Sequence, residues 1–236
     1  MVVGLGPGGA EFLTPRAEAA LREAQVIIGY KTYLHFIKAL LVDKEVRSSG
    51  MRKEIDRARE AVTLAQEGAV VAVVSSGDPG VYGMAGIILE LAAGTVAVEV
   101  VPGVTAATAA AAVLGAPLMH DFAVISLSDL LTPWETIARR LEMAAQADFI
   151  IVLYNPKSKG RVTQIARARD IIKAHRQPQT PVGIVRNARR PGEEKVVTTL
   201  EAMLGEEIDM FSTVVIGNSQ TRIEHGYMVT PRGYSL

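Results

Sequence analysis

The chain has 236 residues, a formal net charge of +0, 49% hydrophobic and 21% charged residues, and no cysteine. This length is enough for one large domain or two small ones, and the apolar content excludes a disordered chain. Without cysteine there are no disulfides, thiolate metal sites or cysteine nucleophiles, and the balanced charge offers no electrostatic attraction to nucleic acid.

Two further features narrow the class of protein. No apolar run reaches the roughly eighteen residues of a membrane span, and the amino terminus lacks the pattern of a signal peptide. We therefore expect a cytoplasmic protein without a membrane partner. The histidines show no metal-ligand spacing, so we expect no metal held by protein side chains alone. They are His35, His120, His175 and His225.

Apolar runs of strand length alternate with segments of helical period along the chain. The clearest run, AVVAVV at 69–74, is apolar throughout, as expected for a strand buried on both faces. The other predicted strands are 26–28, 95–101, 122–127, 149–153, 181–185, 194–199, 213–216 and 227–229, and the predicted helices are 51–68, 129–146 and 158–175. This alternation predicts an α/β fold with largely parallel strands.

The pattern restarts after an alanine-rich run, near Ala116 and Pro117. Strand–helix units follow one another before this point, and shorter, more polar strands appear near the end of the chain. We therefore expect two α/β domains, residues 1–116 and 117–236, which face each other across a cleft.

The first glycine-rich segment, GLGPGG, satisfies the dinucleotide pattern G-x-G-x-x-G through Gly4, Gly6 and Gly9. Its context does not fit NAD binding, because Pro7 lies inside the pattern and the helical period begins only near Pro15. The segment after the second strand also lacks the acidic residue that would bind a ribose. A tight turn and a ligand-lining loop remain equally good interpretations.

Two further loops follow predicted strands and are shaped by glycine and proline. They are SSGDPGVYG at 75–83 and VPGVTAA at 101–107. Open α/β sheets bind ligands at the carboxyl ends of their strands, where such loops bring backbone amides and carbonyls close to a ligand. The free amides of the second loop and the Thr105 hydroxyl could hold a carboxylate. We expect one ligand shared by both loops.

The motifs GLGPGG, SSGDPGVYG, VPGVTAA, LYNP at 153–156 and TPVGIVRN at 180–187 resemble those of the tetrapyrrole methylases, in order and spacing. Segments 120–141, 153–161 and 185–194 resemble the branch that methylates C17 of precorrin-3B with ring contraction. The resemblance implies an S-adenosylmethionine-dependent C-methyltransferase of cobalamin (corrin) biosynthesis. It also implies a homodimer of two-domain α/β subunits, with the cofactor in the interdomain cleft and without the Rossmann fold of other methyltransferases.

The resemblance implies eight cofactor-binding residues, which are Gly77, Asp78, Pro79, Val81, Thr105, Ala106, Asn155 and Gly183. Relatives often carry another residue at the position of Asn155, so this contact is expected to come from the main chain. Many relatives also have an aspartate where this chain has Gly9, which weakens any acid role for the first loop.

The implied chemistry makes modest demands on acid–base groups. Methyl transfer from a sulfonium to carbon requires positioning and desolvation more than a dedicated acid–base pair. The carboxylates of a corrin precursor favour a basic rim, for which Arg186, Arg189 and Lys157 are candidates, with a solvated charged surface as the alternative.

Ring contraction leaves the extruded carbon as an acetyl group and benefits from a group that moves a proton. Asp129, Ser128 and His120 are the candidate catalytic residues, from a segment that also contains Ser126 and Asp121. The alternative for Asp129 is a helix cap, and the alternative for His120 is a linker position.

Other functions remain open on the sequence alone. A sister methylase could act on another tetrapyrrole position or in diphthine synthesis. A non-catalytic nucleotide-binding regulator, with the first glycine loop as its site, would bind a nucleotide instead of S-adenosylhomocysteine. The sequence also leaves open whether the substrate carries cobalt.

Overall fold

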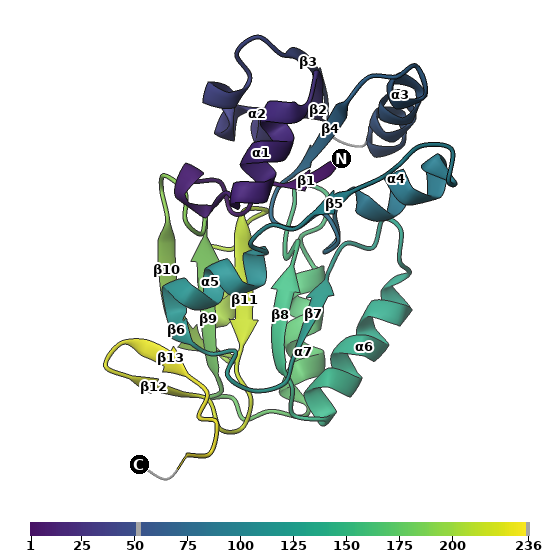
Figure 1. Cartoon of the computed structure of the whole chain (residues 1–236). Coiled ribbons are helices and arrows are strands. Elements are labelled where there is room, and N and C mark those ends of the chain that lie inside the picture. The colour runs from purple at the N-terminus through teal and green to yellow at the C-terminus, as the bar shows by residue number, and fades with distance from the viewer. Residues whose placement is uncertain (51–52, 235–236) are drawn as a thin grey trace. The chain divides into compact units, whose positions relative to one another are not determined.

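Two units, residues 1–106 and 107–236, divide the chain in the computed structural model, which describes residues 1–50 and 53–234 (Figure 1). The second unit begins with helix α5 (Ala106–Leu114), whereas the sequence places the boundary after 116. The difference arises because the alanine-rich helix packs within the second unit. Its Ala107, Ala110 and Leu114 belong to the same buried cluster as strand residues of that unit.

The first unit is built on a five-stranded sheet with the strand order β3-β2-β4-β1-β5, and all its pairs are parallel. The strands are β1 (Val2–Gly4), β2 (Val26–Tyr30), β3 (Glu45–Ser49), β4 (Val71–Ser75) and β5 (Val100–Val101). Every residue of β4 is buried, which confirms the interpretation of the apolar run for residues 71–74, whereas Ala69 and Val70 precede the strand and Val70 is exposed. Only the last two residues of the predicted strand 95–101 pair with the sheet.

Helices cover both faces of this sheet, because successive strand residues point to opposite sides. The helices are η1 (Ala10–Phe12), α1 (Pro15–Glu23), α2 (Lys31–Phe36), η2 (Lys38–Leu40), α3 (Glu54–Gln66) and α4 (Ala85–Ala92). One face packs against α1 and α2, and the other packs against α3 and α4. Residues 51–52 of the predicted helix 51–68 lie outside the described residues.

The second unit contains a five-stranded sheet in the order β10-β9-β11-β8-β7. Its strands are β7 (Phe122–Ser126), β8 (Ile150–Tyr154), β9 (Pro181–Arg186), β10 (Glu194–Thr199) and β11 (Ser212–Ile216). Only β7 and β8 pair in parallel, so the expectation of largely parallel strands is wrong for this sheet. The reason is that β11 lies antiparallel between β8 and β9, and that β10 pairs antiparallel with β9. Strands β7, β8 and β9 therefore end at the same edge.

Helices α6 (Trp134–Gln146) and α7 (Gln164–Lys173) cover one face of this sheet, and α5 covers the other (Figure 1). The remaining elements are η3 (Met203–Gly205) and a small sheet of β12 (Arg222–Glu224), β13 (Tyr227–Val229) and β6 (Gly115–Ala116). None of the described helices is long and apolar enough to cross a membrane.

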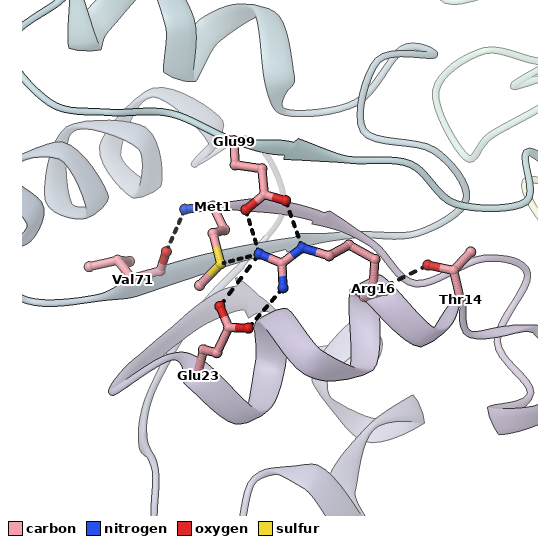
Figure 2. A network of polar contacts seen from close by, with 7 residues as sticks. Met1, Thr14, Arg16, Glu23, Val71 and Glu99 are labelled. Carbon is pink, nitrogen blue, oxygen red and sulfur yellow. Dashed lines mark hydrogen bonds and ion pairs between the residues drawn. The ribbon is translucent and has the colours of Figure 1, made fainter.

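An ion-pair network ties α1 to the segment that enters β5 (Figure 2). The Arg16 guanidinium donates to both carboxylate oxygens of Glu99, at 2.7 and 2.5 Å, and also pairs with Glu23 at 2.9 Å. The hydrogen bonds from Arg16 hold the pKa of Glu99 below its ordinary value of 4.5. The network lies at the amino ends of the strands and therefore supports the sheet opposite the glycine loops.

The variant E99Q is expected to lower the melting temperature slightly at neutral pH, since exposed ion pairs contribute little. Because the folded-state pKa of Glu99 is depressed, its contribution is present above the unfolded-state pKa and is lost as the pH falls through the folded-state pKa. Thermal melts across this acid range should therefore converge for E99Q and the parent protein. A difference in melting temperature that stays constant across this pH range would contradict this account. The control is E90Q, on the exposed face of α4.

Candidate active site

Three glycine-rich loops meet at the carboxyl edge of the first sheet. Strand β1 lies between β4 and β5, so its own loop separates the two loops that the sequence predicts to share a ligand. Gly6 and Gly77 exchange backbone hydrogen bonds of 3.1 and 2.8 Å, which join the first loop to the second. The three loops therefore form one surface, made largely of backbone.

The loops approach one another more closely than side chains would permit. A Cβ atom on Gly103 would lie 2.2 Å from the Gly77 carbonyl oxygen, and one on Gly4 would lie 2.7 Å from the Gly103 nitrogen. Gly77 itself has a φ of +67°, in the left-handed region that favours glycine. Glycine at these positions is thus explained by the packing of three backbones.

Asp78 links two of the loops through its carboxylate. Its Oδ1 accepts a hydrogen bond from the Gly80 nitrogen at 2.8 Å, and its Oδ2 accepts one from the Gly103 nitrogen at 3.0 Å. Both oxygens are thus engaged in shaping the loops. The family resemblance implies that Asp78 is a cofactor residue, but the sequence gave no sign of this bridge, because Gly103 follows a different strand.

The remaining predicted cofactor residues of the first unit lie beside these loops. A Cβ atom on Gly77 would be 3.8 Å from both the Ala106 nitrogen and the Thr105 Cα, so the second and third loops are in van der Waals contact. Pro79 is buried, and Val81 is partly exposed. The structure thus brings together Gly77, Asp78, Pro79, Val81, Thr105 and Ala106.

The GLGPGG segment leads into the single-turn 3-10 helix η1 and not into an α-helix. Helix α1 begins at Pro15, and the Thr14 side chain caps it by accepting a hydrogen bond from the Ala17 nitrogen at 3.1 Å. A pyrophosphate site of the dinucleotide-binding type requires the helix to start within the motif. The structure therefore agrees with the interpretation that this segment is not an NAD fingerprint.

Asn155 follows the last residue of β8 and adopts the left-handed region, with a φ of 50°. Its side-chain Nδ2 donates to Ser126 Oγ at 3.0 Å, and its carbonyl oxygen accepts from Arg161 Nη2 at 2.9 Å. A cofactor contact is expected from the main chain of Asn155, and its carbonyl oxygen is thus already hydrogen-bonded to Arg161.

Gly183 lies in the middle of β9 and is buried. A Cβ atom there would lie 2.3 Å from Leu114 Cδ1, the end of a fully buried side chain of α5. The space above Gly183 is therefore filled by Leu114, and the requirement for glycine follows from packing within the second unit.

The candidate catalytic residues fall at opposite edges of the second sheet. Ser128 and Asp129 follow the carboxyl end of β7, and Gln164 Nε2 donates to Asp129 Oδ2 at 2.7 Å. His120 precedes the amino end of the same strand, is exposed, and has its Nδ1 3.7 Å from the Asp121 carboxylate. The structure therefore places His120 the length of a strand away from Ser128.

The candidate substrate-binding residues share the carboxyl edge, since Lys157 follows β8, Arg186 is the last residue of β9 and Arg189 follows it. Arg186 is paired with Asp209, Glu207 and Glu194, whose carboxylates raise the pKa of its guanidinium. Its charge is thus largely balanced within the protein. Arg189 has a φ of 58°, and its backbone nitrogen donates to Glu193 Oε2 at 2.6 Å. Lys157 is partly buried.

Arg161 lies four residues after Lys157 in the same basic stretch of the sequence. The structure shows that this side chain joins the ends of β7 and β8, with Nη1 3.4 Å from Ser128 Oγ. Among residues 1–50 and 53–234, no group of three or more His, Asp or Glu side chains is arranged to hold a metal ion.

Comparison with known proteins gives consistent matches over the chain. The family model described as Tetrapyrrole (Corrin/Porphyrin) Methylases matches residues 1–204. The chain is 52% identical to the probable cobalt-factor III C(17)-methyltransferase of Salmonella typhimurium, over 100% of this chain and 99% of that protein.

Two solved structures extend the comparison. The methyltransferase CobJ has a TM-score of 0.93 and 40% identity, with 98% of both chains covered. A Thermus thermophilus uroporphyrin-III C-methyl transferase complexed with S-adenosylhomocysteine has a TM-score of 0.69 and 26% identity, with 92% of this chain and 95% of that one covered.

Proposed function

Because this chain belongs to the tetrapyrrole (corrin/porphyrin) methylases, we propose that it transfers a methyl group from S-adenosylmethionine to C17 of cobalt-factor III in cobalamin biosynthesis. The observation that carries this proposal is the 52% identity over the whole chain to a relative with that named activity. The family and fold class expected from the sequence are confirmed. Contraction of the macrocycle accompanies methylation in the reaction that the sequence motifs imply.

The loops of the first unit are suited to a small polar ligand such as S-adenosylmethionine. Glycine lets the three loops meet backbone to backbone at Gly4, Gly77 and Gly103, and the surface that they form is made largely of amides and carbonyls. When bound, S-adenosylmethionine supplies an electrophilic methyl group. The contribution of Gly77, Asp78, Pro79, Val81, Thr105 and Ala106 is then to fix its position and to exclude water.

The carboxyl edge of the second sheet supplies the groups for the macrocycle. Ser128 and Asp129 provide polar contacts, and Lys157 and Arg189 provide positive charge for the acetate and propionate groups of a corrin precursor. Arg186 contributes less, because three carboxylates already surround it. His120 lies outside this arrangement, at the other end of β7.

Calorimetric titration with S-adenosylhomocysteine tests the cofactor assignment. We expect saturable binding in the micromolar range, in keeping with typical affinities for metabolites, and no binding of NAD. A nucleotide-binding regulator would give the opposite result. A panel of tetrapyrroles with and without cobalt, together with a diphthine-pathway substrate, then separates the proposed activity from that of a sister methylase.

The variant D78A is expected to bind S-adenosylhomocysteine at least about tenfold more weakly while it keeps its fold. The reason is that loss of the carboxylate frees the Gly80 and Gly103 amides that it holds, and hydrogen bonds to a charged group contribute about 1.5–3 kcal/mol. Titration and far-UV circular dichroism measure the two quantities. D43N, at an exposed loop position of the same unit, is the control. Unchanged affinity in D78A would refute the assigned role.

The homodimer and the cytoplasmic location belong to this proposal as well, since they are properties that the resemblance and the composition imply. Sedimentation at several protein concentrations tests the dimer.

A further inference from the structure

A closed ring of hydrogen bonds joins the loops that follow β7 and β8. The side chain of Asn155 donates to Ser126 Oγ at 3.0 Å, and the Ser128 nitrogen donates to the same oxygen at 3.2 Å. Arg161 completes the ring, since Nη1 is 3.4 Å from Ser128 Oγ and Nη2 is 2.9 Å from the Asn155 carbonyl oxygen. We call Ser126, Ser128, Asn155 and Arg161 the serine–arginine ring.

The Arg161 guanidinium donates to the Ser128 hydroxyl and to the Asn155 carbonyl, and no carboxylate of the described residues forms an ion pair with it. Its backbone exchanges hydrogen bonds of 2.9 and 3.2 Å with Ser158, and its Nε atom is buried without a hydrogen bond. Arg186 presents the opposite case, with three carboxylates around it. The positive charge of Arg161 therefore acts on the polar groups of the ring.

Ser128 occupies the position in the ring that suits contact with a ligand. Its oxygen accepts from a cation, while its hydroxyl hydrogen is donated to no residue in the described part of the chain. A hydroxyl that accepts from a guanidinium is a stronger donor, because hydrogen bonds polarise one another. The hydroxyl is thus prepared to donate to an oxygen outside the protein.

The loop that continues from Ser128 presents both polar and apolar side chains. Beyond Ser128, the Asp129 carboxylate is held by Gln164, and the next two residues, Leu130 and Leu131, are 65% and 93% exposed. An apolar surface beside a hydroxyl donor is complementary to a macrocycle, which has apolar faces and oxygen-bearing side chains at its edge.

We propose that Ser128 donates a hydrogen bond to an oxygen of the tetrapyrrole substrate, and that Arg161 is the positioning residue that orients this hydroxyl. This inference rests on the proposed function. It assigns Ser128, among the three candidate catalytic residues, to direct contact with the substrate. It also gives Asn155 a structural role in the ring.

A double-mutant cycle tests the inference. The variants S128A, R161M and S128A/R161M are assayed for methyl transfer from labelled S-adenosylmethionine to cobalt-factor III, with kcat and KM determined separately. S128A is expected to lower kcat about 100-fold, as for the loss of one preorganised donor. Because Arg161 acts through Ser128, the double variant should be no slower than S128A by more than about twofold.

The variants S128T and R167M complete the design. S128T keeps the hydroxyl and should recover most of the activity lost in S128A. R167M removes an arginine of α7 that lies over the Trp134 ring at 4.2 Å, outside the serine–arginine ring, and should leave kcat unchanged. If R161M does not fold, R161K takes its place in the cycle.

Two outcomes would overturn the inference. In the first, S128A retains kcat within about twofold of the parent enzyme. In the second, the effects of S128A and R161M multiply in the double variant, as expected for independent sites. Titration with S-adenosylhomocysteine distinguishes these two outcomes from failure of the proposed function. S128A, which keeps both Arg161 and the Asn155 carbonyl in place, should bind it as the parent protein does, whereas a parent protein that does not bind it contradicts the methyltransferase assignment itself.

Discussion

The variant G103A is expected to lose S-adenosylhomocysteine affinity by about 100-fold, which corresponds to about 2.7 kcal/mol. A Cβ atom at this position would lie 2.2 Å from the Gly77 carbonyl oxygen and 2.9 Å from the Gly4 carbonyl carbon. Both contacts are with backbone, so no rotation of a side chain can relieve them. The three loops must separate, and the hydrogen bond from the Gly103 nitrogen to Asp78 is strained at the same time.

Calorimetric titration and thermal unfolding measure this effect. The matched control is G86A, because a Cβ atom on Gly86, an exposed residue of α4, would meet nothing within 4 Å. That variant should bind normally and gain about 0.5–1 kcal/mol in stability, since alanine favours a helix over glycine. Normal binding by G103A would show that the contact between the loops is unimportant for the cofactor.

In the first unit, the loops at the carboxyl edge of the sheet were predictable from the sequence, but the contacts between them were not. The glycines and prolines after each strand predicted three shaped turns, and the resemblance predicted their ligand. The bridge from Asp78 to Gly103 was not predictable, because it depends on β1 lying between β4 and β5. Strand order is a tertiary property, and the local pattern of apolar residues does not encode it.

The second unit departs further from the sequence prediction, and for a related reason. Alternating strands and helices usually indicate a parallel sheet. Here β11 lies antiparallel between β8 and β9, and β10 pairs antiparallel with β9, so three of the four strand pairs are antiparallel. Whether a basic side chain is neutralised by nearby carboxylates was equally hard to predict from the sequence. Arg186 and Arg161 are both basic residues at or after the end of a strand, yet only the fold places three carboxylates around Arg186.

The variant G183A is expected to lower the free energy of unfolding by about 1–3 kcal/mol through overpacking, without a specific loss of cofactor affinity. The cause is Leu114, whose Cδ1 and Cδ2 atoms would lie 2.3 and 2.6 Å from the new Cβ atom. Leu114 is fully buried between α5 and the sheet, so it has little space into which to move. Urea unfolding measures the stability, and titration of the folded variant measures the affinity.

A compensating substitution distinguishes packing from a cofactor contact at Gly183. L114A alone should cost about 2–5 kcal/mol, because it leaves a cavity. In G183A/L114A the added methyl group enters that cavity, so the double variant should be more stable than the sum of the two losses by about 1 kcal/mol. G205A, where a Cβ atom would meet nothing within 4 Å, controls for the effect of alanine itself. Strict additivity, together with weaker S-adenosylhomocysteine binding in G183A, would instead make Gly183 part of the cofactor site, as the family resemblance implies.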